Sequence, residues 1–132
     1  MKNINFGKIN KFIIFGGGNF VLNLIKQMRK ADCKVVIFTS KRYLDEIIDS
    51  RPFSEHLDAS GSAYYASKQI NSDLRVKKHV RSDVIGLSIG APWIFNEKFI
   101  KSFGGKLINM HGTRLPQNRG GGGFSWQIML NI

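Results

Sequence analysis

Residues 11–38, KFIIFGGGNFVLNLIKQMRKADCKVVIF, carry the pattern that sets the class of this fold. The runs KFIIF and KVVIF at its two ends are short, apolar and rich in branched side chains, as buried parallel strands are. Between them, apolar residues recur at the spacing of one helix face: Val21, Leu24, Ile25 and Met28. Strand, helix and strand in this order predict the opening of a doubly wound α/β sheet.

Strands and helices continue to alternate along the rest of the chain, without repeats or a linker. We expect further strands at residues 63–67, 83–89 and 106–110. We expect helices at residues 43–48, 72–80, 96–103 and 124–131, and a loop at residues 53–62. The sequence therefore predicts one α/β, Rossmann-like domain over residues 1–132, a mostly parallel sheet with helices on both faces. Because the chain stops at Ile132 within an expected helix, we expect this domain to be truncated before its end.

The charge balance is strongly basic, with 20 Lys and Arg against 9 Asp and Glu and a formal net charge of +11. Such a surplus attracts anionic partners. The basic residues are scattered, however, without a run of five and without interleaved aromatic residues. This distribution favours solvated faces over a nucleic-acid surface.

The chain has one cysteine, Cys33, which excludes an internal disulfide and a cysteine-based zinc cluster. No run of 18 apolar residues is present, and the polar start of the chain lacks a signal-peptide core. We therefore expect a cytoplasmic protein with no membrane partner. His56 and His79 are expected to be exposed and to have no catalytic role.

A glycine-rich turn follows the first strand and consists of Gly16, Gly17, Gly18 and Asn19. Glycines before a helix bring bare N–H groups toward an anion, so this turn is interpreted as a phosphate site, with plain turn geometry as the alternative. Gly16 and Gly18 also match a dinucleotide fingerprint, but Val21 replaces its third glycine. The acid of an NAD site is missing after the second strand, where Arg42 would suit an NADP phosphate. An NAD(P)-binding oxidoreductase therefore remains an alternative.

The pattern that points most directly to chemistry is LINMHGTRLPQNRG at residues 107–120. Asn109 and His111 are two residues apart at the end of an expected strand, so both belong to one face of the sheet. An amide that donates to a developing oxyanion and an imidazole that moves a proton suit acyl transfer to an amine. A hydrogen-bonded structural histidine is the alternative for His111.

Residues 107–126, LINMHGTRLPQNRGGGGFSW, resemble the motif of the 10-formyltetrahydrofolate-dependent formyltransferases, in which an Asn-x-His pair precedes a Leu-Pro loop and an Arg-Gly. Residues 82–90 (SDVIGLSIG) resemble the strand leading to the folate loop of that family, and residues 12–20 (FIIFGGGNF) resemble its opening strand and turn. This resemblance implies a formyltransferase amino-terminal domain. The reaction it implies carries a formyl group from 10-formyltetrahydrofolate to a primary amine and needs no metal.

The same resemblance implies roles for individual residues. Asn109 would hydrogen-bond the formyl oxygen, and His111 would transfer the proton. The folate cosubstrate would be bound by Ser88, Ile89, Gly90, Ala91, Pro92, Trp93, Ile94 and Phe95. The amine substrate would be bound by Gly16, Gly17, Gly18, Asn19, Thr113, Arg114, Arg119 and Gly120.

The acceptor implied by the resemblance is a phosphate-bearing amine, either a nucleotide-linked amino sugar or the initiator methionyl-tRNA. Gly112, Thr113 and Arg114 stand where Pro-Ser-Leu is commoner in the family, which resembles the amino-sugar branch more. The family also uses an aspartate a few tens of residues after the histidine, whereas the last aspartate of this chain is Asp83. A non-catalytic remnant is therefore a further alternative.

Overall fold

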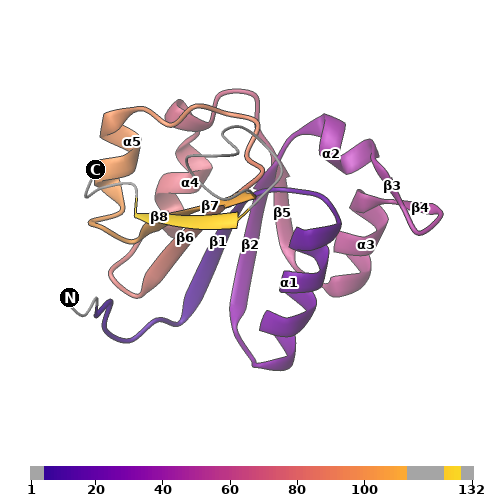
Figure 1. Cartoon of the computed structure of the whole chain (residues 1–132), viewed down its shortest axis with the longest axis horizontal. Coiled ribbons are helices and arrows are strands. Elements are labelled where there is room, and N and C mark those ends of the chain that lie inside the picture. The colour runs from indigo at the N-terminus through magenta and orange to yellow at the C-terminus, as the bar shows by residue number, and fades with distance from the viewer. Residues whose placement is uncertain (1–4, 113–123, 129–132) are drawn as a thin grey trace.

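The computed structural model describes residues 5–112 and 124–128, and its centre is a six-stranded sheet (Figure 1). The strands lie in the order β5-β2-β1-β6-β7-β8. Their bounds are β1 Lys11–Gly16, β2 Lys34–Thr39, β5 Ala63–Ala66, β6 Val84–Ile89, β7 Leu107–Gly112 and β8 Phe124–Ile128. All neighbouring pairs are parallel except β7 and β8, which pair antiparallel. The predicted Rossmann-like, mostly parallel sheet is confirmed.

Helices cover both faces of this sheet, as Figure 1 shows, with α1 and α3 on one side and α4 and α5 on the other. Their bounds are α1 Asn19–Lys30, α2 Lys41–Asp45, α3 Phe53–Ser60, α4 Leu74–His79 and α5 Glu97–Ser102, with a 3-10 turn at Ile70–Ser72. A two-stranded hairpin, β3 Ile47–Ile48 and β4 Arg51–Pro52, stands beside α2 and α3. None of the helices in the described part is long and apolar enough to cross a lipid bilayer.

Two apolar cores lie on the two faces, and the alternation of side chains along β1 supplies both. Ile14 packs with α1 and α3, whereas Ile13 and Phe15 pack with α4 and α5. The Phe15 ring contacts the rings of Phe38, Phe95, Phe99 and Phe103, at centroid distances of 5.8, 5.4, 5.5 and 5.8 Å. Burial of a side chain of this size contributes about 1.5–3 kcal/mol. Strands β2 and β6 also contribute side chains to both cores.

The predicted loop at residues 53–62 is wrong, because the structure has helix α3 there. Phe53, His56 and Leu57 are all buried and follow the i, i+3, i+4 spacing of a helix face. Gly61 ends the helix in the left-handed conformation, with φ of 72°. The expected helix at residues 43–48 also ends early, because the backbone at Glu46 is extended and leads into the hairpin.

The predicted helix at residues 124–131 is wrong as well, since Phe124–Ile128 form strand β8. Met110 of β7 pairs with Trp126 of β8 in antiparallel register. The segment FSWQI alternates apolar and polar residues and is rich in aromatic and β-branched types, which favours a strand. The edge of β7 presents backbone donors and acceptors that must be paired, and β8 satisfies them.

His56 is buried rather than exposed, which corrects the expectation from the sequence. Its Nε2 lies 2.6 Å from the carbonyl oxygen of Ile48, so this nitrogen carries the proton and donates. Its Nδ1 then accepts from the Arg51 guanidinium at 3.3 Å. His56 therefore fastens the hairpin to α3. His79 is half-buried and accepts a hydrogen bond from the Lys11 ammonium.

We expect His56→Leu to lower the free energy of unfolding by about 1–3 kcal/mol, because the buried Ile48 carbonyl loses its donor. Chemical denaturation of both proteins measures the difference. Glu55→Gln, an exposed change on the same helix, is the control and should stay within about 0.5 kcal/mol. Equal stability of His56→Leu and the native chain would contradict the anchoring role.

Candidate active site

The sheet has one switch in strand order at its centre, between β1 and β6. From β1 the chain moves outward to β2 and β5, and it then returns to the other side of β1 to form β6. The connections that leave β1 and β6 therefore diverge at the carboxyl ends of these strands. In open α/β sheets, ligands bind in the crevice at such a point.

The last residues of β1 and β6, Gly16 and Ile89, are register partners at this point. Gly16 has φ of 144°, and a Cβ on it would overlap the carbonyl oxygen of Ile89. Only glycine lets the two backbones approach this closely. The turn after β1 and the loop after β6 thus start from one fixed junction.

The turn after β1 leads directly into α1. Gly18 is the N-cap residue with φ of 96°, and its carbonyl accepts a hydrogen bond from Leu22 at 3.0 Å. The first turn of α1 holds no acidic residue, so the positive end of the helix dipole is not offset there. Gly16, Gly17, Gly18 and Asn19 therefore lie together at the junction, and their binding of phosphate stays a prediction.

The end of β2 differs from that of an NAD site, which needs a carboxylate there. Thr39 occupies this position and is fully buried. Ser40 follows and caps α2 by accepting a hydrogen bond from the backbone of Tyr43 at 3.2 Å. No acidic residue therefore stands at the end of β2, where an NAD-binding domain has the carboxylate that binds the ribose.

Asn109 and His111 stand near the carboxyl end of β7. Asn109 is the register partner of Ser88, and Ser88 is the register partner of Phe15. Side chains of neighbouring parallel strands at one register level share a face, so Asn109 belongs to the face of α4 and α5. Ser88 is buried and Asn109 is half-buried. The backbone of His111 pairs with that of Ser125.

Several of the predicted site residues cannot be compared with this geometry. The side chain of His111 lies outside the described part of the structure. The same holds for the predicted substrate residues Thr113, Arg114, Arg119 and Gly120.

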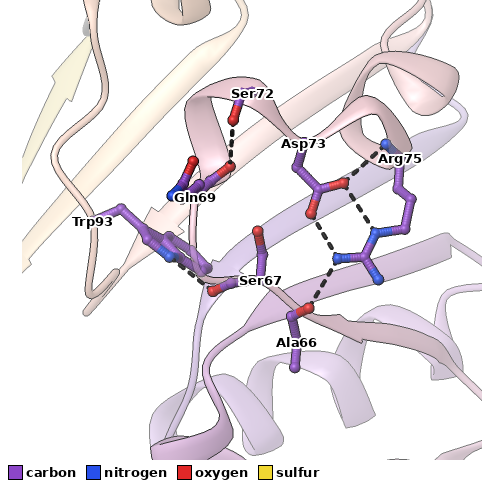
Figure 2. Close-up of polar contacts among 7 residues, drawn as sticks. All are labelled: Ala66, Ser67, Gln69, Ser72, Asp73, Arg75 and Trp93. Atoms are coloured by element: carbon purple, nitrogen blue, oxygen red, sulfur yellow. Dashed lines mark hydrogen bonds and ion pairs between the residues drawn. The ribbon is translucent and has the colours of Figure 1, made fainter.

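The loop after β6 holds the remaining predicted folate residues. Three of its residues contact other parts of the chain. Trp93 donates its indole N–H to the Ser67 carbonyl at 3.1 Å (Figure 2). Phe95 packs on Phe99 with ring centroids 4.9 Å apart. The carbonyl of Ile94 accepts from the Asn71 amide at 2.9 Å, while the Ile94 side chain is 91% exposed. Trp93 and Phe95 thus hold the loop in place, and Ile94 faces solvent.

An ion pair that the sequence did not predict supports this loop from the end of β5. Arg75 binds the Asp73 carboxylate at 2.7 Å and also donates to the Ala66 carbonyl at 2.9 Å (Figure 2). The Asp73 carboxylate in turn accepts from the backbone N–H of Arg75 and so caps α4. Hydrogen bonding from Arg75 lowers the pKa of Asp73 to about 2.

Tyr43 is a residue of this junction that sequence reasoning missed. It lies on α2, yet its hydroxyl donates to the carbonyl of Gly90 at 2.6 Å, and its ring lies against Gly17. Nothing in its sequence spacing indicated this position, because α2 follows β2 rather than β1 or β6.

One cavity of the structure lies away from the junction of β1 and β6. This cavity, of about 680 Å³ between α4 and α5, is lined by residues such as Val76, Asn96 and Phe99, and by none of the predicted site residues. Among the residues that the structure describes, no group of three or more His, Cys, Asp or Glu side chains is arranged to hold a metal ion.

No protein-family profile matches the sequence, and no curated protein matches it. Solved structures do match. Phosphoribosylglycinamide formyltransferase from Brucella melitensis matches with a TM-score of 0.57 at 22% identity, over 86% of this chain and 62% of that one. The enzymes of the same name from Anaplasma phagocytophilum and Coxiella burnetii match with TM-scores of 0.60, at 19% and 11% identity, over 86% of this chain and 55% and 56% of theirs.

The chain therefore has the fold of these formyltransferases, and the resemblance expected from the sequence is confirmed at the level of the fold. It spans between 55% and 62% of the length of these three structures.

We expect Gly16→Ala to lower the free energy of unfolding by about 4 kcal/mol, since it combines backbone strain with overlap on the Ile89 carbonyl. Denaturant titration measures the loss. Gly104→Ala is the matched control, because Gly104 also has positive φ, 57°, but nothing within 4 Å of an added Cβ. That variant should lose only about 1–2 kcal/mol. Equal losses of unfolding free energy in the two variants would show that the close approach of β1 and β6 does not contribute to stability.

The ion pair predicts a pH dependence of stability. The folded pKa of Asp73, about 2, lies below its ordinary value of 3.8. A depressed pKa contributes stability that is present above the ordinary value and is lost as pH falls through the folded value. We expect the stability of the native chain to fall between pH 4 and pH 2, and that of Asp73→Asn to fall less. Asp45→Asn, at an exposed position, is the control for the loss of one negative charge. If the unfolding free energy of Asp73→Asn fell with pH as steeply as that of the native chain, the ion pair would not be the cause of the pH dependence.

Proposed function

We propose that this chain is the folate-binding part of a formyltransferase, which carries a formyl group from 10-formyltetrahydrofolate to a primary amine. One observation carries the proposal. Asn109, two residues before His111, is in register with Ser88 near the end of β6, the strand that leads to the candidate folate loop, in a chain with the fold of formyltransferases. An amide donor and a proton carrier beside that loop are the groups that formyl transfer needs.

The chemistry assigned to the two residues is simple. The amine attacks the formyl carbon, and the Asn109 amide donates a hydrogen bond to the oxygen that becomes negative. The carbon–nitrogen bond to the folate then breaks. His111 takes the proton from the attacking amine and delivers it to the departing folate nitrogen. No net charge is left, and no oxidation takes place.

The segment from Ser88, near the end of β6, to Phe95 in the following loop suits a flat heteroaromatic cosubstrate in its composition and its support. Its glycine at Gly90 has φ of 64°, which lets the backbone turn toward a ligand. Trp93 and Phe95 fix the loop on the sheet side. Backbone groups that are held in this way recognise the edge of a planar ring without much loss of conformational entropy on binding.

The acceptor in this proposal is a primary amine that bears phosphate. The turn at Gly16, Gly17, Gly18 and Asn19 is the part of the site that would hold the phosphate. Three acceptors share that chemistry: a nucleotide-linked amino sugar, initiator methionyl-tRNA, and the phosphoribosylglycinamide for which the structural neighbours are named. Thr113, Arg114, Arg119 and Gly120 are the residues proposed to distinguish among them.

Calorimetric titration tests the cosubstrate directly. We expect the chain to bind 5-formyltetrahydrofolate, a stable analogue of the cosubstrate, and its melting temperature to rise in the presence of this ligand. NADPH is titrated in parallel. Tight binding of NADPH with no response to the folate would overturn the proposal in favour of an oxidoreductase domain.

Asn109→Ala and His111→Ala test the catalytic roles, with transfer of isotopically labelled formyl to amine acceptors as the assay. We expect Asn109→Ala to lower kcat about 100-fold or more, because it removes a donor to the oxyanion. His111→Ala should lower kcat by about 100-fold to 10,000-fold. Asn23→Ala, on the exposed side of α1, is the control and should keep full activity. An undiminished rate for His111→Ala would exclude it as the proton carrier.

A further inference from the structure

Tyr43 lies where the two loops of the junction come together. Its hydroxyl donates to the Gly90 carbonyl in the loop after β6, at 2.6 Å. Its ring lies against Gly17 in the turn after β1, so closely that a Cβ on Gly17 would be 2.5 Å from the ring carbon Cγ. A Cβ on Gly90 would be 2.9 Å from the hydroxyl. One side chain therefore contacts both loops, and at each contact it faces a glycine.

Tyr43 packs against the apolar core on the face of α1 and α3, which accounts for its ring but not for the hydrogen bond of its hydroxyl. Helix α2 has five residues, none of them buried, and it begins at the Ser40 cap. Tyr43 itself is half-buried, and burial raises the pKa of its phenol, so the hydroxyl stays protonated and remains a donor at neutral pH. A phenylalanine would fill the same space on Gly17, so the hydroxyl serves the contact with Gly90.

The bond between Tyr43 and Gly90 matters because the two loops have different tasks. Gly17 belongs to the turn proposed for the phosphate of the acceptor, and Gly90 belongs to the loop proposed for the folate. The Gly16–Ile89 contact fixes the starts of the two loops, one residue before each of these glycines. Tyr43 is then the side chain that links the loops beyond that fixed point.

We propose that Tyr43 is a positioning residue that holds the turn at Gly17 and the loop at Gly90 in one arrangement, so that the acceptor site and the cosubstrate site are formed together. This inference rests on the proposed function for the identity of the two ligands. The linkage itself is a property of the chain and is present without ligand.

The experiment compares Tyr43→Phe with Tyr64→Phe in the full chain. Tyr64→Phe is the matched control, because it also removes a phenol hydrogen bond of 2.6 Å, from the edge strand β5 to Asp58 on α3. The first measurement is the NMR order parameter of the Gly17 and Gly90 amides without ligand. We expect both to fall in Tyr43→Phe and neither to change in Tyr64→Phe. Unchanged order parameters, or a fall at Gly90 alone, would overturn the linkage.

The second measurement is affinity, with 5-formyltetrahydrofolate and inorganic phosphate as separate probes. We expect Tyr43→Phe to weaken folate binding about 5-fold, the ratio that corresponds to one hydrogen bond. Phosphate binding should weaken in the same variant, and Tyr64→Phe should bind both probes as the native chain does. Loss of folate affinity with native phosphate affinity would show that the two sites are not formed together.

The two measurements separate the inference from the function on which it rests. If the native chain binds neither probe, the proposed function fails, and the order parameters alone decide whether Tyr43 links the loops. If the native chain binds the folate and both variants bind it equally well, the proposed function stands and the positioning role of Tyr43 is wrong. The melting temperatures of Tyr43→Phe and Tyr64→Phe show whether either substitution causes a general loss of structure.

Discussion

The contact between the backbones of Gly16 and Ile89 is the constraint on which the rest of this molecule depends. It closes the pairing of β1 with β6 at the point where the order of the strands switches. β1 also supplies Ile14 to one core and Phe15 to the other. A shift of this strand by one residue would exchange these two side chains between the faces and separate the two strand ends. The register of β1 against β6 therefore sets both the packing of the two cores and the meeting of the two strand ends.

The candidate active site follows from that register, although its parts are far apart in sequence. Gly17, Tyr43 and Gly90 come from the connections after β1, β2 and β6, and Asn109 lies in β7; parallel pairing brings the carboxyl ends of these strands to one edge of the sheet. The loop after β6 is supported by the Trp93 hydrogen bond to Ser67, and the Asp73–Arg75 pair binds Ala66 at the end of β5. Contacts of this kind hold a loop in one conformation.

The errors of sequence interpretation have physical causes in particular residues. Residues 53–62 were expected to be a loop and His56 to be exposed, whereas His56 is buried on the inner face of α3, with its two ring nitrogens satisfied by Ile48 and Arg51. Residues 124–128 were expected to be helical, although FSWQI alternates apolar and polar residues, and the edge of β7 gives them a partner as a strand. In both segments, contacts with residues outside the segment fix a structure that the short local pattern only suggests.

Local patterns were sufficient for the α/β class, the first strand–helix–strand unit and the position of Asn109 and His111 at a strand end, because apolar period and glycine turns are properties of neighbouring residues. They were not sufficient for the strand order, for the meeting of Gly16 with Ile89, for the Asp73–Arg75 support or for Tyr43. Those depend on which strands pair, and pairing is settled by burial and backbone hydrogen bonds between segments distant in the chain. The short-range sequence pattern thus located the Asn-x-His pair, and long-range strand pairing placed Asn109 beside Ser88 of β6.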